Sequence, residues 1–298
     1  IFFKYIFELN KEDRIFSWLY ISDLFATFIK IFFRVKAPLI WNVRNTLIKK
    51  KDYSLITYLS YIFCLKLFKN IPYKIVFNSK KAMDQHVSKG YPFKKSIVIY
   101  NGFHKLIKEN SIELKKEFLN LICVARYHPQ KNHSLLIKTL SYFKKKYKRK
   151  FILHLVGENI EINNHELVNL LQSYLIFDNV KLHGTLTPIE VHNLFAISDI
   201  SLLLSNFGES FPNVLAESML YGTIPIATSV GDSDYIISDF GEILPLDISP
   251  LQISEIILKY ANLKIYSSAV WIEKIKACQK FSLNRFNIKN IASQFRDL

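Results

Sequence analysis

The 298-residue sequence is poor in the residues that bend or cross-link a chain, with 8 glycines, 9 prolines and 3 cysteines. The shortage of glycine and proline argues against collagen-like, linker-rich and disordered proteins. Cys64, Cys123 and Cys278 are odd in number, far apart and flanked by apolar residues, so neither a disulfide framework nor a CxxC metal or redox site is indicated. A reducing compartment, the cytoplasm, is the predicted location.

The sequence also lacks a recognisable set of metal ligands. Its eight histidines are scattered, and the closest pairing, His128 with His133, has neither the HExxH arrangement nor a third ligand nearby. We therefore predict no metal site and no cofactor.

Acidic residues are scarce in the first part of the chain. Residues 1–110 hold 20 Lys/Arg against 7 Asp/Glu, a net +13, which leaves 20 against 18, or +2, for residues 111–298. No zinc finger, helix-turn-helix or RNP-like motif accompanies this charge, so nucleic acid is not the expected partner. The cluster Lys49, Lys50 and Lys51 among apolar stretches favours an anionic membrane surface, at the inner face of the plasma membrane. A solvated basic face remains the alternative.

One apolar run, residues 15–33, approaches the length of a membrane span. Asp23 and Lys30 lie inside it, and we therefore predict a buried helix in a packed domain. The sequence has no initiator Met and no basic head before an apolar core, so we do not expect a signal peptide at its beginning. We expect the first domain to lack its opening strands.

Short β-branched runs alternate with longer amphipathic stretches, which is typical of parallel sheets with crossover helices. The predicted strands are residues 38–44, 74–79, 96–101, 120–126, 151–157, 179–184, 199–205, 224–229 and 242–246. The predicted helices are residues 52–70, 80–89, 132–147, 163–174, 187–197, 212–221 and further helix from 249 to the end. The fold class is therefore α/β, with two Rossmann-like parallel-sheet domains.

A polar stretch separates the two predicted domains. We assign residues 1–104 to a truncated first domain, 105–117 to a linker and 118–278 to a second domain. Residues 279–298 should form a C-terminal helix that returns to the first domain. Ligands of open α/β sheets bind beyond the carboxyl ends of the strands. Gly157 and Gly184 stand at such ends, and we expect both to approach a bound donor nucleotide.

The most informative segment is residues 205–233, SNFGESFPNVLAESMLYGTIPIATSVGDS. Ser210 is a plausible N-cap and Pro212 suits a first turn, which predicts a helix from about Phe211 to Gly222. The N-terminus of such a helix attracts a diphosphate. Glu209 before the helix and Glu217 within it would then bracket the phosphates.

A second segment, VARYHPQKNHSLLI at residues 124–137, places two cations in one strand-to-helix loop. Arg126 follows the strand and Lys131 enters the next helix. Two cations at this position suit a diphosphate leaving group. On their own they would be ordinary surface residues, and it is their pairing with the glutamate segment that makes them candidates.

Residues 205–233 closely resemble the EX7E region of the family 4 glycosyltransferases, which are retaining enzymes of the two-domain GT-B fold with a cleft between the domains. The resemblance implies that Glu209 holds hydroxyls of the transferred sugar and that Glu217 holds the ribose. It implies donor contacts from backbone amides, those of Phe211, Asn213 and Val214. In the same family an Arg and a Lys in an R...KG pattern neutralise the departing diphosphate, as Arg126 and Lys131 would here, with Asn132 in place of the usual Gly.

The resemblance implies transfer of a sugar from a nucleoside diphosphate, here a UDP-sugar, to a hydroxyl of a glycan or of a polyprenyl-diphosphate-linked acceptor. Such a reaction uses no protein nucleophile, because an oxygen of the donor phosphate takes the acceptor proton. In the first domain Asp23 and Arg44 stand in segments similar to the acceptor side of bacterial polysaccharide enzymes. A buried Asp–Arg pair or a surface arginine would account for them equally well.

Two alternatives to glycosyl transfer remain open from the sequence. Paired glutamates also serve retaining glycosidases, whose two carboxyl groups stand about 5 Å apart. A chain with an incomplete first domain could instead be a nucleotide-sugar-binding or membrane-associated module that turns over no substrate.

Overall fold

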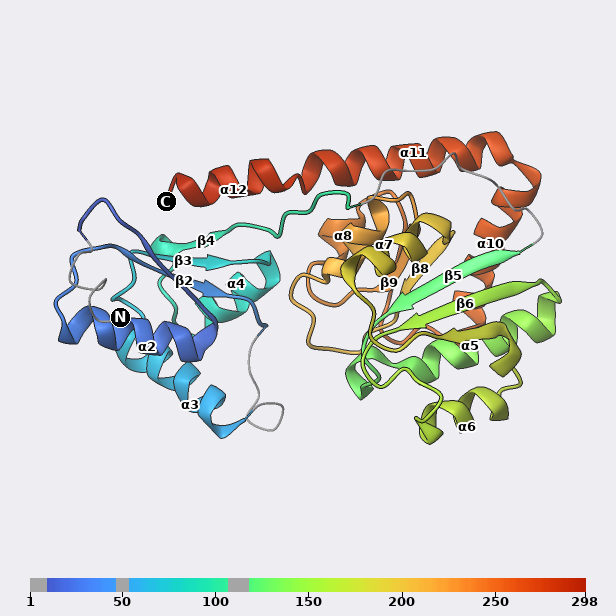
Figure 1. Cartoon of the computed structure of the whole chain (residues 1–298), viewed down its shortest axis with the longest axis horizontal. Coiled ribbons are helices and arrows are strands. Elements are labelled where there is room, and N and C mark those ends of the chain that lie inside the picture. The colour runs from blue at the N-terminus through green and yellow to red at the C-terminus, as the bar shows by residue number, and fades with distance from the viewer. Residues whose placement is uncertain (1–9, 47–53, 107–117) are drawn as a thin grey trace. The chain divides into compact units, whose positions relative to one another are not determined.

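The computed structural model describes residues 10–46, 54–106 and 118–298, and it divides into two compact units. The first unit comprises the chain up to Asn101 together with Gly208–Phe211 and Lys289–Leu298, and the second comprises Gly102–Phe207 and Pro212–Ile288. Each unit contains one wholly parallel sheet (Figure 1), so the predicted α/β fold with two parallel sheets is confirmed. Most of the predicted linker lies outside the described residues.

The sheet of the first unit has four strands in the order β1-β2-β3-β4. The strands are β1 (Ile15–Trp18), β2 (Leu39–Val43), β3 (Lys74–Phe77) and β4 (Ser96–Val98). The helices are α2 (Leu19–Phe32), α3 (Leu55–Phe63), which continues as the π-helix η2 (Cys64–Phe68), α4 (Lys80–Ser88) and α12 (Ile288–Arg296). Because strands that follow one another in the chain are neighbours, right-handed crossovers bring the connecting helices to one face.

Alternation along the strands divides the core of this unit between the two faces of its sheet. On one face Trp41 packs among the helices α2, α3 and α4. On the other face Ile40 and Val76 pack with Ile291 of α12. The last helix of the chain therefore belongs to the core of the first unit, whereas the expected boundary at residue 278 falls inside α11 (Ser268–Arg285).

The prediction of one buried helix over residues 15–33 is wrong in two respects. The run opens with the strand β1, and the chain turns at Leu19 with a φ of 70° before α2. In α2 the buried residues are Tyr20, Asp23 and Thr27, while most of its large apolar side chains are exposed. Hydrogen bonds explain this burial, because Ser17 Oγ donates to Asp23 and Trp41 Nε1 donates to Thr27.

The second unit has a six-stranded sheet in the order β10-β9-β8-β5-β6-β7. Its strands are β5 (Leu119–Val124), β6 (Phe151–Val156), β7 (Val180–Leu182), β8 (Ile200–Leu203), β9 (Ile224–Thr228) and β10 (Glu242–Leu244). The chain adds β6 and β7 on one side of β5 and then β8, β9 and β10 on the other. The topological switch point therefore lies between the carboxyl ends of β5 and β8, where doubly wound sheets bind ligands.

Helices cover both faces of this sheet in Figure 1. They are α5 (His133–Tyr147), α6 (His165–Ser173), α7 (Pro188–Ile197), α8 (Asn213–Met219), α9 (Ser233–Ile237), α10 (Pro250–Tyr266) and α11. Ile122 of β5 packs with Phe195 of α7 and with Leu220 beyond α8. The short helix α9 was not predicted, because its five residues give no periodic signal.

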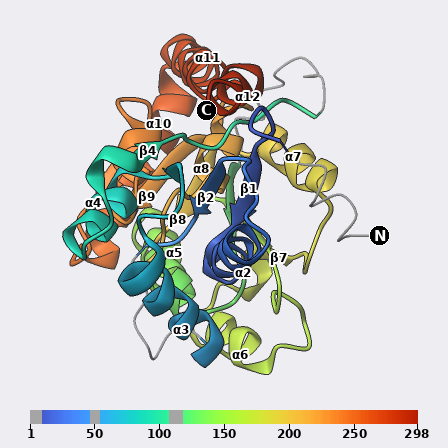
Figure 2. The ribbon, with the colours of Figure 1, turned by 90° about the vertical axis from the view of Figure 1, so that its left-hand side faces the viewer.

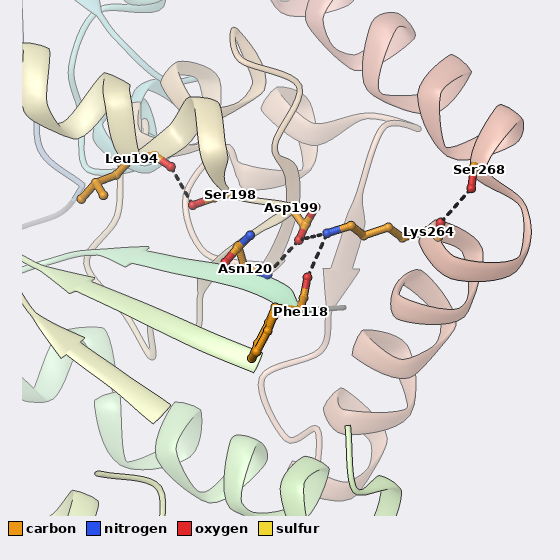
Figure 3. Close-up of polar contacts among 7 residues, drawn as sticks. All are labelled: Phe118, Asn120, Leu194, Ser198, Asp199, Lys264 and Ser268. Carbon is orange, nitrogen blue, oxygen red and sulfur yellow. Dashed lines mark hydrogen bonds and ion pairs between the residues drawn. The ribbon is translucent and has the colours of Figure 1, made fainter. Parts of the chain in front are cut away.

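An ion pair is buried at the amino ends of β5 and β8 (Figure 3). Lys264 Nζ of α10 lies 2.7 Å from Asp199 Oδ2 and donates to the Phe118 carbonyl oxygen at 3.0 Å. Asp199 also accepts a hydrogen bond from the backbone N–H of Asn120. These contacts attach α10 to the edge of the sheet opposite the switch point.

All three cysteines are buried. Burial raises the pKa of Cys123 and Cys278 to about 12, and it also raises the pKa of Cys64. Within the described ranges no helix is both long enough and apolar enough to cross a membrane.

Candidate functional site

The two predicted cations lie in the loop between β5 and α5, on one side of the switch point. Arg126 is exposed and its guanidinium donates to Gln130 Oε1 at 3.4 Å. Lys131 ends a 3-10 turn, Pro129–Lys131, and its backbone N–H donates to the His128 carbonyl. One short loop thus carries both positive charges at the edge of the sheet where a nucleotide is expected.

Asn132 shows why the family's usual glycine can be replaced here. Its backbone is left-handed, with φ 51° and ψ 49°, a conformation that glycine adopts freely and that asparagine tolerates better than most residues. The Asn132 side chain caps α5 by accepting from the Leu135 N–H. The substitution keeps the turn and adds a cap.

Hydrogen bonds join this loop to the loop that follows β8. Asn206 N–H donates to the Gln130 carbonyl at 2.8 Å, and Asn132 Nδ2 donates to Asn206 Oδ1 at 2.8 Å. Thr228 Oγ1 at the end of β9 donates to the Ser205 carbonyl at 2.6 Å, which fixes the other side of the β8 loop. Sequence reasoning missed Gln130 and Asn206, since only the fold brings these two loops together.

Gly157 and Gly184 shape the adjoining loops. A Cβ on Gly157, whose φ is 144°, would meet the Ala125 carbonyl oxygen at 2.5 Å, so the end of β6 approaches the backbone next to Arg126 closely. Gly157 N–H donates to the Gly184 carbonyl at 2.7 Å. Both glycines therefore allow neighbouring loops to approach each other closely. Their predicted contact with a donor stays a prediction.

The helix within the EX7E-like segment is shorter than predicted. It runs over Asn213–Met219 with Pro212 at the N-cap and no side-chain cap. The predicted cap by Ser210 is wrong, because Ser210 Oγ donates to Asn78 Oδ1 at 2.8 Å instead. Phe211 lies before the helix, and its ring centroid lies 5.6 Å from that of Tyr100, with the two rings tilted by 41°. Asn213 and Val214 occupy the first helical turn, and their predicted contacts with a donor stay a prediction.

The two glutamates of this segment fall in different structural units. Glu209 belongs to Gly208–Phe211, which clusters with the first unit, and its side chain is buried. Glu217 belongs to α8 of the second unit, is partly buried, and burial raises the pKa of its carboxyl. The helix beneath Glu217 is held by Ser218, whose hydroxyl hydrogen-bonds to Ser201 of β8 at 2.9 Å.

Asp23 and Arg44 belong to one polar cluster at the carboxyl ends of β1 and β2. Arg44 donates to Asn101 Oδ1 at 2.6 Å and to Asn42 Oδ1 at 3.4 Å, and burial lowers its pKa. Asn42 Nδ2 donates to the Ser17 carbonyl, and Ser17 Oγ donates to Asp23 Oδ1. No ion pair joins the described side chains of Asp23 and Arg44, so the alternative of a direct buried pair is wrong.

His128 and His133 have different surroundings. His128 Nδ1 accepts from the Gln130 N–H, whereas His133 is buried against Tyr127. Burial, together with the charge of Lys131, lowers the pKa of His133 to about 4, which keeps its ring neutral. In the part of the chain that the structure describes, no group of three potential metal ligands comes together.

Comparison with known proteins decides the family. The model of the family described as Glycosyl transferases group 1 matches residues 105–272, more than half of the chain. The chain belongs to this family. The matched range includes the Arg126 loop, the switch point and α8 with Glu217.

Individual relatives agree with this membership. An "Uncharacterized 41.2 kDa protein in cps region" of Klebsiella pneumoniae is 25% identical over 226 residues, which are 72% of this chain and 57% of that protein. The chain thus spans less than two thirds of this relative's length. Anabaena HepE in complex with UDP superposes with a TM-score of 0.79 at 18% identity, covering 99% of this chain and 80% of HepE.

A further solved structure is WaaG, described as a glycosyltransferase involved in lipopolysaccharide biosynthesis. It superposes with a TM-score of 0.68 at 13% identity, covering 87% of this chain and 77% of WaaG. At such identities the similarity shows the fold, and the expected GT-B fold of this group 1 family member is confirmed.

One of the predicted site residues, Asp23, should have a measurable effect on stability. Desolvation by burial raises the pKa of Asp23 from 3.8 to about 8, against the hydrogen bond from Ser17. Below about pH 4 both the folded and the unfolded state bind this proton, whereas between pH 4 and pH 8 only the folded state keeps it. The contribution of Asp23 to the free energy of unfolding should therefore be largest below about pH 4 and should decline as the pH rises toward 8.

We expect Asp23→Asn, which imitates the protonated acid, to remove this decline. Relative to the unmodified chain, the variant should gain on the order of a few kcal/mol between pH 4 and pH 8, as measured by urea unfolding. Asp84→Asn is the control, because Asp84 is exposed in its ion pair with Lys80. Parallel pH profiles for the unmodified chain and Asp23→Asn would show that Asp23 is ionised in the folded state.

Proposed function

We propose that this group 1 glycosyl transferase moves a sugar from a nucleoside diphosphate donor, a UDP-sugar, to a hydroxyl of a glycan or a polyprenyl-diphosphate-linked acceptor, with retention of anomeric configuration as in family 4. The observation that carries the proposal is the position of Arg126 and Lys131. Both lie in one loop at the switch point, next to the segment that leads to Glu217. Two cations at this edge, in a loop that backbone and side-chain hydrogen bonds hold in place, suit a leaving diphosphate.

The chemistry requires little of the protein beyond orientation and charge. The bond from the anomeric carbon to the diphosphate oxygen breaks, and a bond from the acceptor oxygen to the anomeric carbon forms on the same face. The acceptor proton passes to an oxygen of the donor phosphate, and the nucleoside diphosphate leaves. Arg126 and Lys131 stabilise the negative charge that builds up on it, while Glu209 orients the sugar.

The donor and acceptor classes find support in the relatives. HepE has been crystallised with UDP, WaaG is described as acting in lipopolysaccharide biosynthesis, and the Klebsiella relative is described as lying in a cps region. Assembly of a surface polysaccharide from UDP-sugars fits these three descriptions. The acceptor would meet the first unit near Arg44 and Asn101, whose hydrogen bond presents a cation at the carboxyl end of β2.

The same proposal places the enzyme in the cytoplasm, at the inner face of the plasma membrane. The net +13 of residues 1–110 would hold it at anionic lipid while polyprenyl-linked acceptors are extended. Lys49, Lys50 and Lys51, which suggested this location, lie outside the described residues.

Substitution of the two glutamates tests the division of roles. Glu217→Ala should weaken binding of free UDP by about tenfold to a hundredfold, because hydrogen bonds from ribose hydroxyls to a carboxylate are lost. Glu209→Ala should bind UDP almost normally and lose turnover instead, since its carboxylate orients the reacting sugar. Calorimetric titration and release of UDP from a panel of UDP-sugars measure the two effects.

Glu255→Ala provides the matched control, because Glu255 is an exposed glutamate of α10 in an ion pair with Lys146. It should change neither quantity. Equal loss of UDP affinity in the Glu217 and Glu209 variants would contradict the proposed roles.

A further inference from the structure

The helix α2 exposes an apolar stripe along its length. Ile21, Phe25, Phe28 and Phe32 follow one another at intervals of three and four residues, so they lie on one face of the helix. All four side chains are exposed, and Phe32 reaches 77%. The opposite face carries the buried Tyr20 and the polar groups that bind the sheet. The helix is thus apolar on the side that faces solvent.

The neighbouring helix α3 carries a similar stripe. Its exposed members and those of the following π-helix are Ile56, Leu59, Phe63 and Leu67. The rings of Phe28 in α2 and of the half-buried Phe68 in η2 lie 5.4 Å apart, so a ring contact joins the first stripe to the helix that carries the second. Figures 1 and 2 both show α2 and α3 side by side in the first unit. We call the two stripes together the α2–α3 face.

Lysine and arginine outnumber carboxylates in the segment of the sequence that contains the α2–α3 face. Between residues 15 and 69 there are nine Lys/Arg, of which Lys49, Lys50 and Lys51 lie outside the described residues, and two carboxylates, Asp23 and Asp52. Asp23 is fully buried and Asp52 lies outside the described residues. Arg34 and Lys36 follow α2 directly and are exposed. The segment thus combines aromatic rings and cations with few carboxylates, which suits an apolar and anionic partner better than a protein of ordinary composition.

The geometry points to the α2–α3 face as a surface that inserts its apolar side chains into an anionic lipid bilayer, with the flanking cations at the headgroups. Exposed apolar patches of this kind mark interaction sites. Phe and Leu on one side of a helix with Lys and Arg beside them are typical of helices that lie in the membrane interface. This inference rests on the membrane location proposed above. It adds a second binding force, because salt screens the attraction between charges but not the insertion of apolar side chains.

A fluorescent reporter must be placed on the α2–α3 face itself. The exposed Trp18 lies with Phe16 on the sheet face that packs against α12, whereas α2 and α3 cover the other face. Leu59→Trp puts an indole at an exposed position of α3 within the α2–α3 face. We expect vesicles of phosphatidylglycerol and phosphatidylcholine to shift the added emission of this variant to shorter wavelength, and brominated lipids to quench it. Part of the binding should persist at about 1 M salt, where the Debye length is about 3 Å. This measurement needs no turnover.

A pair of substitutions tests the face itself. Phe32→Ser combined with Leu67→Ser should weaken partitioning onto these vesicles by at least about tenfold and remove the salt-resistant part. Ile162→Ser combined with Ile189→Ser is the matched control, since both side chains are exposed and apolar in the second unit. Both double variants should retain the unfolding transition and the UDP affinity of the unmodified chain, so that loss of lipid binding is separable from loss of the proposed function.

Three results would overturn the inference. The first is normal vesicle binding by the Phe32/Leu67 variant, and the second is emission of the Leu59→Trp variant that brominated lipid leaves unchanged. The third is a stable oligomer in which the emission of the Leu59→Trp variant does not respond to vesicles, because the α2–α3 face would then be covered by a second copy.

Discussion

Arg126→Ala and Lys131→Ala should each lower kcat/KM for a UDP-sugar by a factor of roughly 30 to 1,000. These factors correspond to about 2 to 4 kcal/mol of transition-state stabilisation, the usual loss when one preorganised group facing developing charge is removed. The two cations share one loop, which hydrogen bonds through Gln130 and Asn206 fix at the switch point. Because both would act on the same diphosphate, their effects should not add in the double variant.

Release of UDP at subsaturating donor measures this loss. Lys138→Ala is the matched control, since Lys138 is an exposed lysine of α5 a short distance along the chain. It should leave kcat/KM unchanged. Full activity of the Arg126/Lys131 double variant would place the diphosphate elsewhere and remove the observation on which the proposed function depends.

Lys264→Met should lower the free energy of unfolding by about 3 to 5 kcal/mol, because it leaves Asp199 as a buried charge without its cation. The Lys264 side chain is 3% exposed and also donates to the Phe118 carbonyl, which loses its donor (Figure 3). Adding Asp199→Asn should recover most of the loss, since the unpaired charge disappears and the Asn120 N–H keeps an acceptor.

Lys259→Met is the control for this prediction. Lys259 pairs with Glu242 at 2.7 Å, but its side chain is 65% exposed. Exposed pairs contribute about 0 to 1 kcal/mol, so this variant should unfold almost normally in urea. A loss for Lys264→Met as small as the one expected for Lys259→Met would show that Asp199 is reached by water and that the ion pair adds little.

The strands of this fold are predictable from sequence for a physical reason. A strand buried on both faces must be a short apolar run. Each of the predicted runs contains a strand, and the central ones, such as Leu119–Val124 and Ile224–Thr228, are largely or wholly buried. The strand β1 is not predicted, because no break in the apolar run of the sequence separates it from α2. The chain turns at Leu19, a residue that rarely adopts positive φ and so gives no signal of a turn.

Burial of polar side chains depends on distant partners, which the sequence does not reveal. The hydroxyl of Thr27 is buried because Trp41 donates to it across 14 positions, and the apolar neighbours of Thr27 face outward as a result. The cap of α8 was mispredicted for the same reason, since the partner of Ser210 is Asn78, 132 positions away. The preference of serine for helix N-termini marks Ser210 as a capping candidate, but it does not reveal the residue to which Ser210 hydrogen-bonds.

The candidate site is predictable in its parts and not in its assembly. Arg126, Lys131 and Glu217 stand out because a motif of fixed spacing carries them. Asn132 stands out only as a departure from the family, and its left-handed backbone explains why the departure is harmless. Gln130 and Asn206 carry no motif, so their role in joining two loops emerges from the fold alone.

The burial of every cysteine makes the chain suitable for site-specific labelling. Thiol reagents attack the thiolate, and the raised pKa of Cys123 and Cys278 leaves almost none at neutral pH, besides the steric protection of all three side chains. A new cysteine at the exposed Lys94 of the first unit and another at the exposed Lys138 of the second would therefore accept spin labels without removal of the natural ones. Electron paramagnetic resonance on that pair, with and without UDP, would measure the distance between the units directly.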